Sequence, residues 1–265
     1  MQISDLKRHI FIVLCGVTLA LGGNSARAFD ASKIVKDDTP SNKIFEFFFK
    51  FRKDGKKEEA FEVLKYAADH GNPAAQWKLA RIYQTGDGVE PDPLLAFGMF
   101  QKIAAAYPLA HPNTPNWQFS ADALVALGDY YKKGIRGTNV TADRQKAKMM
   151  YTTAAMVFRH PSAQFELGRM QLLDTQGFGQ QRQGIRNLTL AYQKGHVGAE
   201  ALLGYATFEG EYINRDPIRG LVMLGNAMKR AQGAESEWIR PLHDEAYALA
   251  APDQRIAAIQ QLAQN

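Results

Sequence analysis

Hydrophobic and small residues recur at helical spacing through most of the chain, and residues 66–92 show the pattern most clearly. Ala75, Leu79, Ile82 and Tyr83 follow i, i+4, i+7, i+8 spacing, which places them on one face of an amphipathic helix. Glycines precede and follow this helix, so the stretch predicts the end of one helix, a full second helix and a turn into a third. Helix pairs of this kind usually occur in arrays.

The same signature returns along the chain as a leucine, a small residue, an aromatic residue and a glycine. Successive leucines of the signature lie 48, 40 and 36 residues apart. The copy at Leu167-Gly168 lacks the aromatic residue and the final glycine, and the last copy has Thr207 at the aromatic position. The positions that we expect to be structural in the repeat are Leu79, Tyr83, Gly86, Leu127, Gly128, Tyr131, Gly134, Leu203, Gly204 and Gly210. Gly86 and Gly134 are predicted to end helices in the left-handed conformation.

This signature resembles the Sel1-like repeat, a relative of the tetratricopeptide repeat, over roughly residues 58–227. The resemblance implies an all-α fold, a right-handed α-solenoid of Sel1-like, TPR-like helix pairs. The block YAADHGNPAAQWKLARIYQTGDGVEPDPLLAF, the segment FDASKIVKDDTP and an interrupted repeat also resemble the ExoR family. That family comprises periplasmic regulators of exopolysaccharide synthesis in alphaproteobacteria.

The ExoR resemblance implies a function for the chain. A member of this family would bind the periplasmic sensor domain of a two-component histidine kinase of the ExoS/ChvI type. It would repress exopolysaccharide synthesis and would itself be removed by a periplasmic protease. The alternative is a periplasmic scaffold that assembles enzymes of envelope polysaccharide or of the cell wall.

The N-terminus is typical of a secretory signal. Lys7 and Arg8 precede an apolar run over residues 10–21, and Ala26-Arg27-Ala28 follows it, so cleavage is expected after Ala28. A 12-residue apolar helix would span about 18 Å, against roughly 30 Å of hydrocarbon. We therefore expect a periplasmic protein with no stable membrane insertion after cleavage. Cys15 is the only cysteine, so disulfides and thiolate chemistry are not expected in the mature chain.

Charge and length limit the remaining possibilities. Without residues 1–28 the net charge falls from +5 to +3, with 29 basic against 26 acidic residues. The basic residues are scattered, and no nucleic-acid partner is expected. The expected organisation is an extended lead-in at 29–41, then one repeat solenoid at 42–265 with a capping helix at each end and an insertion at 105–121.

Two segments depart from the repeat. The helix predicted at 42–52 carries five phenylalanines, and five aromatic residues within seven positions cannot all face inward, so Phe47 or Phe51 is expected to be exposed. This helix is interpreted as a cap on the first repeat, with partner contact and membrane binding as alternatives. The insertion contains three prolines that preclude a continuous helix. It either packs back on the solenoid or forms a loop that contacts a partner.

The sequence contains no motif of a hydrolase, a phosphate-binding loop, a zinc protease or a dinucleotide-binding fold. We therefore expect no enzyme activity, no cofactor and no metal. His70, His160 and His196 are assigned to equivalent helix C-termini, where each would interact with the helix dipole or with a free carbonyl.

Partner contacts are expected on the concave face, which the first helix of each pair lines in such folds. The candidate partner-binding residues are Gln76, Lys78, Arg81, Trp117, Asp122, Asp129 and Lys132. Arg81 and Trp117 are the preferred anchors, because Arg and Trp are enriched where binding energy concentrates.

Overall fold

The computed structural model describes residues 29–106, 115–173 and 178–264, and these form helices and no strand. The predicted signal segment and its cleavage point at Ala28 lie outside the described residues, as does most of the predicted insertion. None of the described helices is long and apolar enough to cross a bilayer. The all-α prediction is confirmed.

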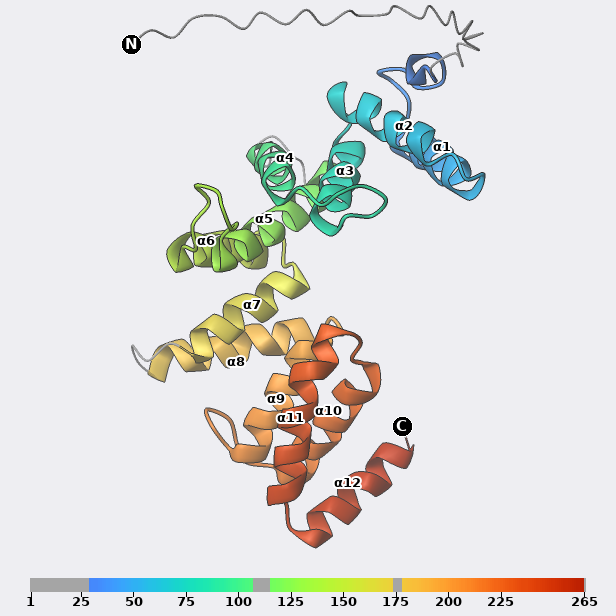
Figure 1. Cartoon of the computed structure of the whole chain (residues 1–265). Helices are drawn as coiled ribbons and strands as arrows, with labels where there is room; N and C mark the ends of the chain where they lie inside the picture. Colours follow the sequence, from blue (N-terminus) through green and yellow to red (C-terminus); the bar gives the residue numbers. More distant parts are fainter. Residues whose placement is uncertain (1–28, 107–114, 174–177, 265) are drawn as a thin grey trace, which may run out of the picture.

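The chain forms an elongated array in which each helix packs mainly on its neighbours in sequence, from α1 and α2 at one end to α12 at the other (Figure 1). The helices are α1 (Ser41–Lys53), α2 (Lys57–Asp69), α3 (Pro73–Thr85), α4 (Pro93–Ala105), α5 (Pro115–Lys133), α6 (Arg144–Met156), α7 (Pro161–Leu172), α8 (Phe178–Tyr192), α9 (Val197–Glu209), α10 (Pro217–Arg230), α11 (Ala234–Leu249) and α12 (Pro252–Gln264).

Side-chain caps fix where the helices begin. The side chains of Asn72, Asp92, Asp143 and Asp216 each accept a hydrogen bond from the third amide beyond them, at the starts of α3, α4, α6 and α10. These bonds satisfy amides that have no partner within the helix. Proline occupies a first-turn position in α3, α4 and α10, where its missing N–H costs nothing.

Glycines fix where several helices end and how closely they approach. Gly86 and Gly134 have φ of 72° and 71°, so the prediction of left-handed helix ends is confirmed. Inside the array, a Cβ added at Gly220 would lie 2.6 Å from the backbone nitrogen of Phe208. A Cβ at Gly128 would lie 2.5 Å from the ring of Tyr151. These contacts require a residue without a side chain, because real Cβ atoms do not approach other atoms so closely.

The hydrophobic core is divided into clusters along the array. The repeat leucines Leu79, Leu127 and Leu203 are buried in three different clusters, while Tyr83 and Tyr131 pack against the first clusters and stay partly exposed. Each cluster is shared between neighbouring helix pairs, as expected for a solenoid.

The lead-in at 29–41 differs from the extended segment that we predicted. Residues Ala31–Lys33 form a short 3-10 helix, η1, and the side chain of Asp30 accepts a hydrogen bond from the amide of Ser32 at its start. Ala31 and Val35 are buried, and η1 contacts α2. Burying these two apolar residues holds the segment on the first helix pair.

The predicted insertion at 105–121 is shorter than expected. Ala105 is the last residue of α4, and α5 already begins at Pro115. Proline is accepted at the first position of a helix, so this third proline starts α5 and does not interrupt a helix. Residues 107–114 lie outside the described part of the chain.

The prediction for the phenylalanine-rich helix was also wrong in one respect. Ile44 and Phe48 take the buried face of α1, while Phe47 and Phe51 pack partly buried against the same core. Phe49 is the exposed phenylalanine, at 58%. It lies about 100° around the helix from Phe48, which turns it away from α2 and α3.

Candidate functional site

A polar groove crosses the first helices of three consecutive pairs, α3, α5 and α7. Its lining consists of Trp77, Arg81, Asp122, Val125, Ala126, Asp129, His160 and Ser162. We call this set of residues the inner groove. It brings together three of the residues that the sequence proposed for partner binding, which are Arg81, Asp122 and Asp129.

The two carboxylates lie on one side of α5. Asp122 and Asp129 are seven residues apart, which is about two helical turns, or roughly 10 Å along the axis. Oδ1 of Asp122 lies 3.0 Å from Nε2 of His160, and Oδ1 of Asp129 accepts a 2.6 Å hydrogen bond from the hydroxyl of Tyr151. Both carboxylates are thereby held in place by residues of the next helices.

Arg81 supplies the positive charge of the groove from α3. Its guanidinium donates a 2.7 Å hydrogen bond to Oε1 of Gln84 on the same helix, and the side chain is exposed. This exposed guanidinium opposite two carboxylates gives the groove a defined charge pattern, which suits recognition of a charged partner surface.

Lys132 lies one turn further along α5 and connects the groove to a neighbouring cluster, since its Nζ lies 3.6 Å from Oδ1 of Asp129. Its Nζ lies 2.9 Å from Oε1 of Glu166, and Arg169 donates a 2.8 Å hydrogen bond to the other oxygen of that carboxylate. Burial alone would raise the pKa of Glu166, but the charges of Lys132 and Arg169 outweigh it and hold that pKa below its usual value. Lys132 therefore links α5 to α7.

Burial, together with the neighbouring Asp129 carboxylate, raises the pKa of Tyr151 far above its usual value. The phenol thus stays protonated and donates to Asp129. This keeps one oxygen of Asp129 occupied from inside the array.

The other proposed partner residues lie outside the inner groove. Nε2 of Gln76 donates a 3.0 Å hydrogen bond to the carbonyl of Ala68, and Nζ of Lys78 lies 5.5 Å from the ring centre of Phe48. Trp117 packs on Phe158, with ring centres 4.2 Å apart. Their part in partner binding stays a prediction.

The histidines correct one sequence assignment. His70 follows α2, and its Nδ1 lies 2.8 Å from the carbonyl of Tyr66, as predicted for a helix C-terminus. His160 and His196 instead precede α7 and α9 as N-terminal caps, so their assignment to C-termini was wrong. The amide of Ala199 donates to Nδ1 of His196, and burial lowers the pKa of this histidine. Pro161, typical of a first helical position, was the signal that marked His160 as a cap.

The sequence reasoning missed Trp77, His160 and Ser162 as groove residues. Trp77 packs against Phe119 from the next unit, with ring centres 5.6 Å apart, and forms part of the groove wall. Among the described residues, no group of His, Cys, Asp and Glu is arranged to hold a metal ion.

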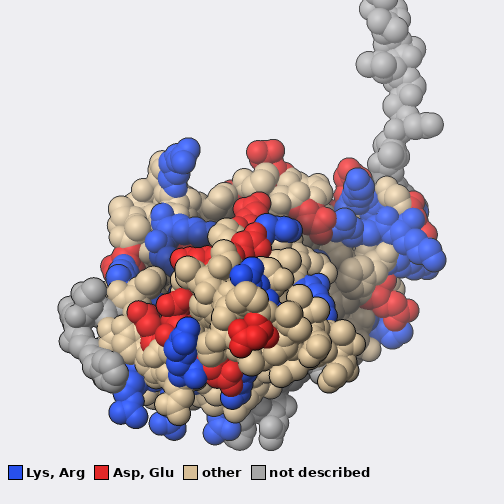
Figure 2. All heavy atoms as spheres, turned by 90° about the horizontal axis from the view of Figure 1, so that it is seen from below, with Lys and Arg blue, Asp and Glu red and all other residues tan. Residues whose placement is uncertain are grey.

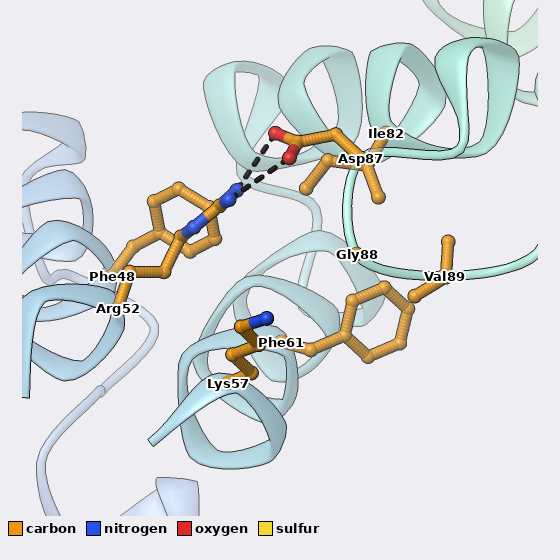
Figure 3. A pocket seen from close by; sticks show the side chains of 8 residues that line it. All are labelled: Phe48, Arg52, Lys57, Phe61, Ile82, Asp87, Gly88 and Val89. Atoms are coloured by element: carbon orange, nitrogen blue, oxygen red, sulfur yellow. Dashed lines mark hydrogen bonds and ion pairs between the residues drawn. The ribbon is translucent and has the colours of Figure 1, made fainter. Parts of the chain in front are cut away.

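A smaller pocket lies between α1, α2 and the turn after α3 (Figure 3). Its apolar walls include Phe48, Phe61 and Ile82. Arg52 closes it with two hydrogen bonds of 2.7 and 2.9 Å to the carboxylate of Asp87, and these bonds lower the pKa of that carboxyl. We interpret this pocket as the join between the N-terminal cap and the first repeat.

Comparison with known proteins agrees with the fold. The Sel1 repeat family matches residues 73–107, 121–156, 161–196 and 197–224. The chain is 34% identical to the "Exopolysaccharide production negative regulator" of Rhizobium leguminosarum bv. viciae, over 98% of this chain and 96% of the relative. It is 33% identical to the protein of the same description from Rhizobium meliloti (strain 1021), over 98% of this chain and 95% of the relative.

Among solved structures, a Sel1 repeat protein from Oxalobacter formigenes has a similar fold. It superposes with a TM-score of 0.58 at 22% identity, covering 84% of this chain and 87% of that one.

Proposed function

Because the chain belongs to the family of Sel1-repeat exopolysaccharide production negative regulators, we propose that it too represses exopolysaccharide production. The observation that carries this proposal is the identity of 33–34% over nearly the whole length of two such regulators. If the repeat units had been missing from the match, or if the match had covered only one segment, the similarity would have supported a common fold and not a common function.

The regulator acts by binding another protein through the inner groove. Arg81, Asp122 and Asp129 expose both signs of charge on a surface that rigid helices hold in place. Such a surface favours specific association over catalysis, because complementary charge sets partner choice and association rate.

The partner in this proposal is the periplasmic sensor domain of a two-component histidine kinase. A protein that binds only the inactive state of a kinase shifts its population by the difference in affinity for the two states. Removal of the regulator by a periplasmic protease would return the kinase to its active state. The proposal places the mature chain in the periplasm after cleavage at Ala28.

Photo-crosslinking in cells tests this function. A photoreactive residue at Val125, a partly exposed groove position, should capture the sensor domain of a membrane-anchored kinase. The same residue at exposed Gln260 on α12 is the matched control and should capture no such protein. If the photoreactive residue at Val125 captured a polysaccharide synthase or hydrolase, this result would contradict the kinase proposal and support the scaffold role. Identical products from both positions would contradict binding through the groove.

A further inference from the structure

The end of the array at α1 carries a concentration of positive charge that the proposed function does not use. Residues 41–57 contain six lysines and arginines but only two carboxylates, Glu46 and Asp54. Figure 2 shows Lys and Arg gathered at the upper right edge of the molecule, with fewer Asp and Glu beside them. Five of its exposed residues form what we call the basic edge, which are Phe49, Lys50, Lys53, Lys56 and Lys57. Both carboxylates of the region, Glu46 and Asp54, are exposed as well.

Ion pairs neutralise the charges beside the basic edge and leave its own lysines available. Lys43 pairs with Glu46 at 2.7 Å, and Arg52 pairs with Asp87 (Figure 3). Within the described part of the chain, Lys50, Lys53 and Lys56 have no carboxylate within ion-pair distance. Glu58 and Glu59 follow in the first turn of α2, where carboxylates complement the positive end of the helix dipole.

Phe49 gives the basic edge an apolar group. It is 58% exposed, and one edge of its ring packs on the buried Phe48 with ring centres 5.2 Å apart, while the rest of the ring faces outward. Phe49, Lys50 and Lys53 lie within about 100° of one another around α1. The apolar face of α1 is buried in the core, but an exposed ring with lysines beside it offers the two kinds of group, apolar and basic, that bind anionic interfaces.

We propose that the basic edge docks the protein on the surface of an anionic phospholipid bilayer. The lysines contact lipid phosphates, and the ring of Phe49 enters the headgroup region. Arg52 is already paired with Asp87 at the adjacent pocket, whereas the lysines of the basic edge and the ring of Phe49 are exposed and can meet a flat anionic surface together. This inference is independent of the inner groove and adds a second binding surface.

Docking at this edge would leave the inner groove free. The basic edge belongs to α1 and the turn into α2, whereas the groove belongs to α3, α5 and α7, further along the array (Figure 1). The protein could therefore bind lipid and a partner protein at once.

Vesicle co-sedimentation of the full chain, as cells process it, tests the proposal. We expect binding to vesicles of phosphatidylcholine with phosphatidylglycerol, lost at high salt, and weak binding to phosphatidylcholine alone. Each lysine near an anionic surface contributes roughly fivefold to partitioning, so a triple variant Lys50→Gln, Lys53→Gln and Lys56→Gln should bind at least about tenfold more weakly. Phe49→Ser should weaken binding by about fivefold or more without changing the salt dependence.

The matched control removes three positive charges from helices outside the basic edge. Lys102, Lys133 and Arg186 are exposed on α4, α5 and α8, and their replacement by Gln should leave vesicle binding within about twofold of the wild type. Circular dichroism should be unchanged in all variants, because every substituted residue is exposed. Equal binding to both kinds of vesicle would overturn the proposal. So would equal losses in the two triple variants, or full binding by the triple variant of the basic edge.

Discussion

At the scale of single residues, Gly55 and Gly134 have nearly the same backbone but different surroundings. Their φ angles are 76° and 71°. A Cβ at Gly55 would meet nothing within 4 Å, whereas one at Gly134 would lie 2.9 Å from the amide nitrogen of Ala142 and 3.1 Å from the carbonyl oxygen of Val140. The cost in stability of the left-handed conformation can therefore be measured separately from the cost of close packing.

We predict that Gly134→Ala destabilises the protein more than Gly55→Ala. The left-handed conformation alone should cost about 1 kcal/mol at Gly55. At Gly134 the added methyl group must also displace backbone atoms, which raises the cost to about 3 kcal/mol. Urea unfolding of the two variants measures the difference. Equal midpoints would show that the turn after α5 is not packed as described.

Glu166 leads to a prediction about pH. Its pKa is lowered in the folded protein, so its stabilising effect is complete above the ordinary value of 4.5 and is lost as pH falls through the lower folded value. Glu166→Gln should cost about 2 kcal/mol at neutral pH, because two charge-assisted hydrogen bonds are weakened. The stability of this variant should then fall less than that of the wild type as the pH drops from about 4.5 through the lower folded pKa of Glu166.

Chemical denaturation as a function of pH measures this effect. Glu58→Gln is the control, since Glu58 is exposed and makes no ion pair among the described residues. Its stability should follow the wild-type pH profile. If Glu166→Gln lost as much stability on acidification as the wild type does, the cluster with Lys132 and Arg169 would not hold α5 to α7.

The sequence predicted the charged residues of the inner groove better than it predicted the residues that contact them. Helical periodicity is enough to place Arg81, Asp122 and Asp129 on the solvent-facing side of the first helices, where the inner groove lies. The contact between Asp122 and His160 joins residues 38 positions apart and depends on how α5 and α7 pack. Periodicity within one helix carries no information on such a contact. The helix end to which His160 belongs was instead marked locally, by Pro161 at the start of α7.

At the scale of elements, α1 shows that two residues of the same type can differ completely in burial. Phe48 and Phe49 are adjacent and identical, yet they are 2% and 58% exposed. We predict that Phe48→Ala lowers stability by about 3 kcal/mol, because it leaves a cavity under the cap. Phe49→Ala should change stability by less than about 0.5 kcal/mol. Thermal or urea unfolding compares them, and similar losses in both would contradict the orientation of α1.

The sequence predicted where a helix begins wherever a capping residue marked its start. Asp92, Asp143 and Asp216 marked helix starts, and the structure uses each as an N-cap. The start of α5 was missed, because Pro115 was taken as a third helix breaker when it is the first helical residue. The 3-10 helix in the lead-in was missed because its stability comes from burial of Ala31 and Val35 against the first repeat, which local sequence does not show.

At the scale of the whole molecule, the series of small cores makes each unit depend on its neighbours. This arrangement keeps α3, α5 and α7 in register, so that one groove receives polar side chains from three units. The function proposed for the chain rests on that register. A change to one groove charge should therefore affect binding without affecting the fold.

The exopolysaccharide output of cells that carry Arg81→Glu as their only copy tests this account most directly. Arg81 is exposed, and in the described part of the chain its side chain hydrogen-bonds only to Gln84 of its own helix, so the variant should fold and accumulate normally. A central Arg contact can contribute about 2 kcal/mol or more, so partner affinity should fall by more than about tenfold. We predict exopolysaccharide output as high as in cells without the gene, and normal output with the control Gln260→Glu. Normal repression by a folded Arg81→Glu protein at wild-type level would contradict regulation through the inner groove.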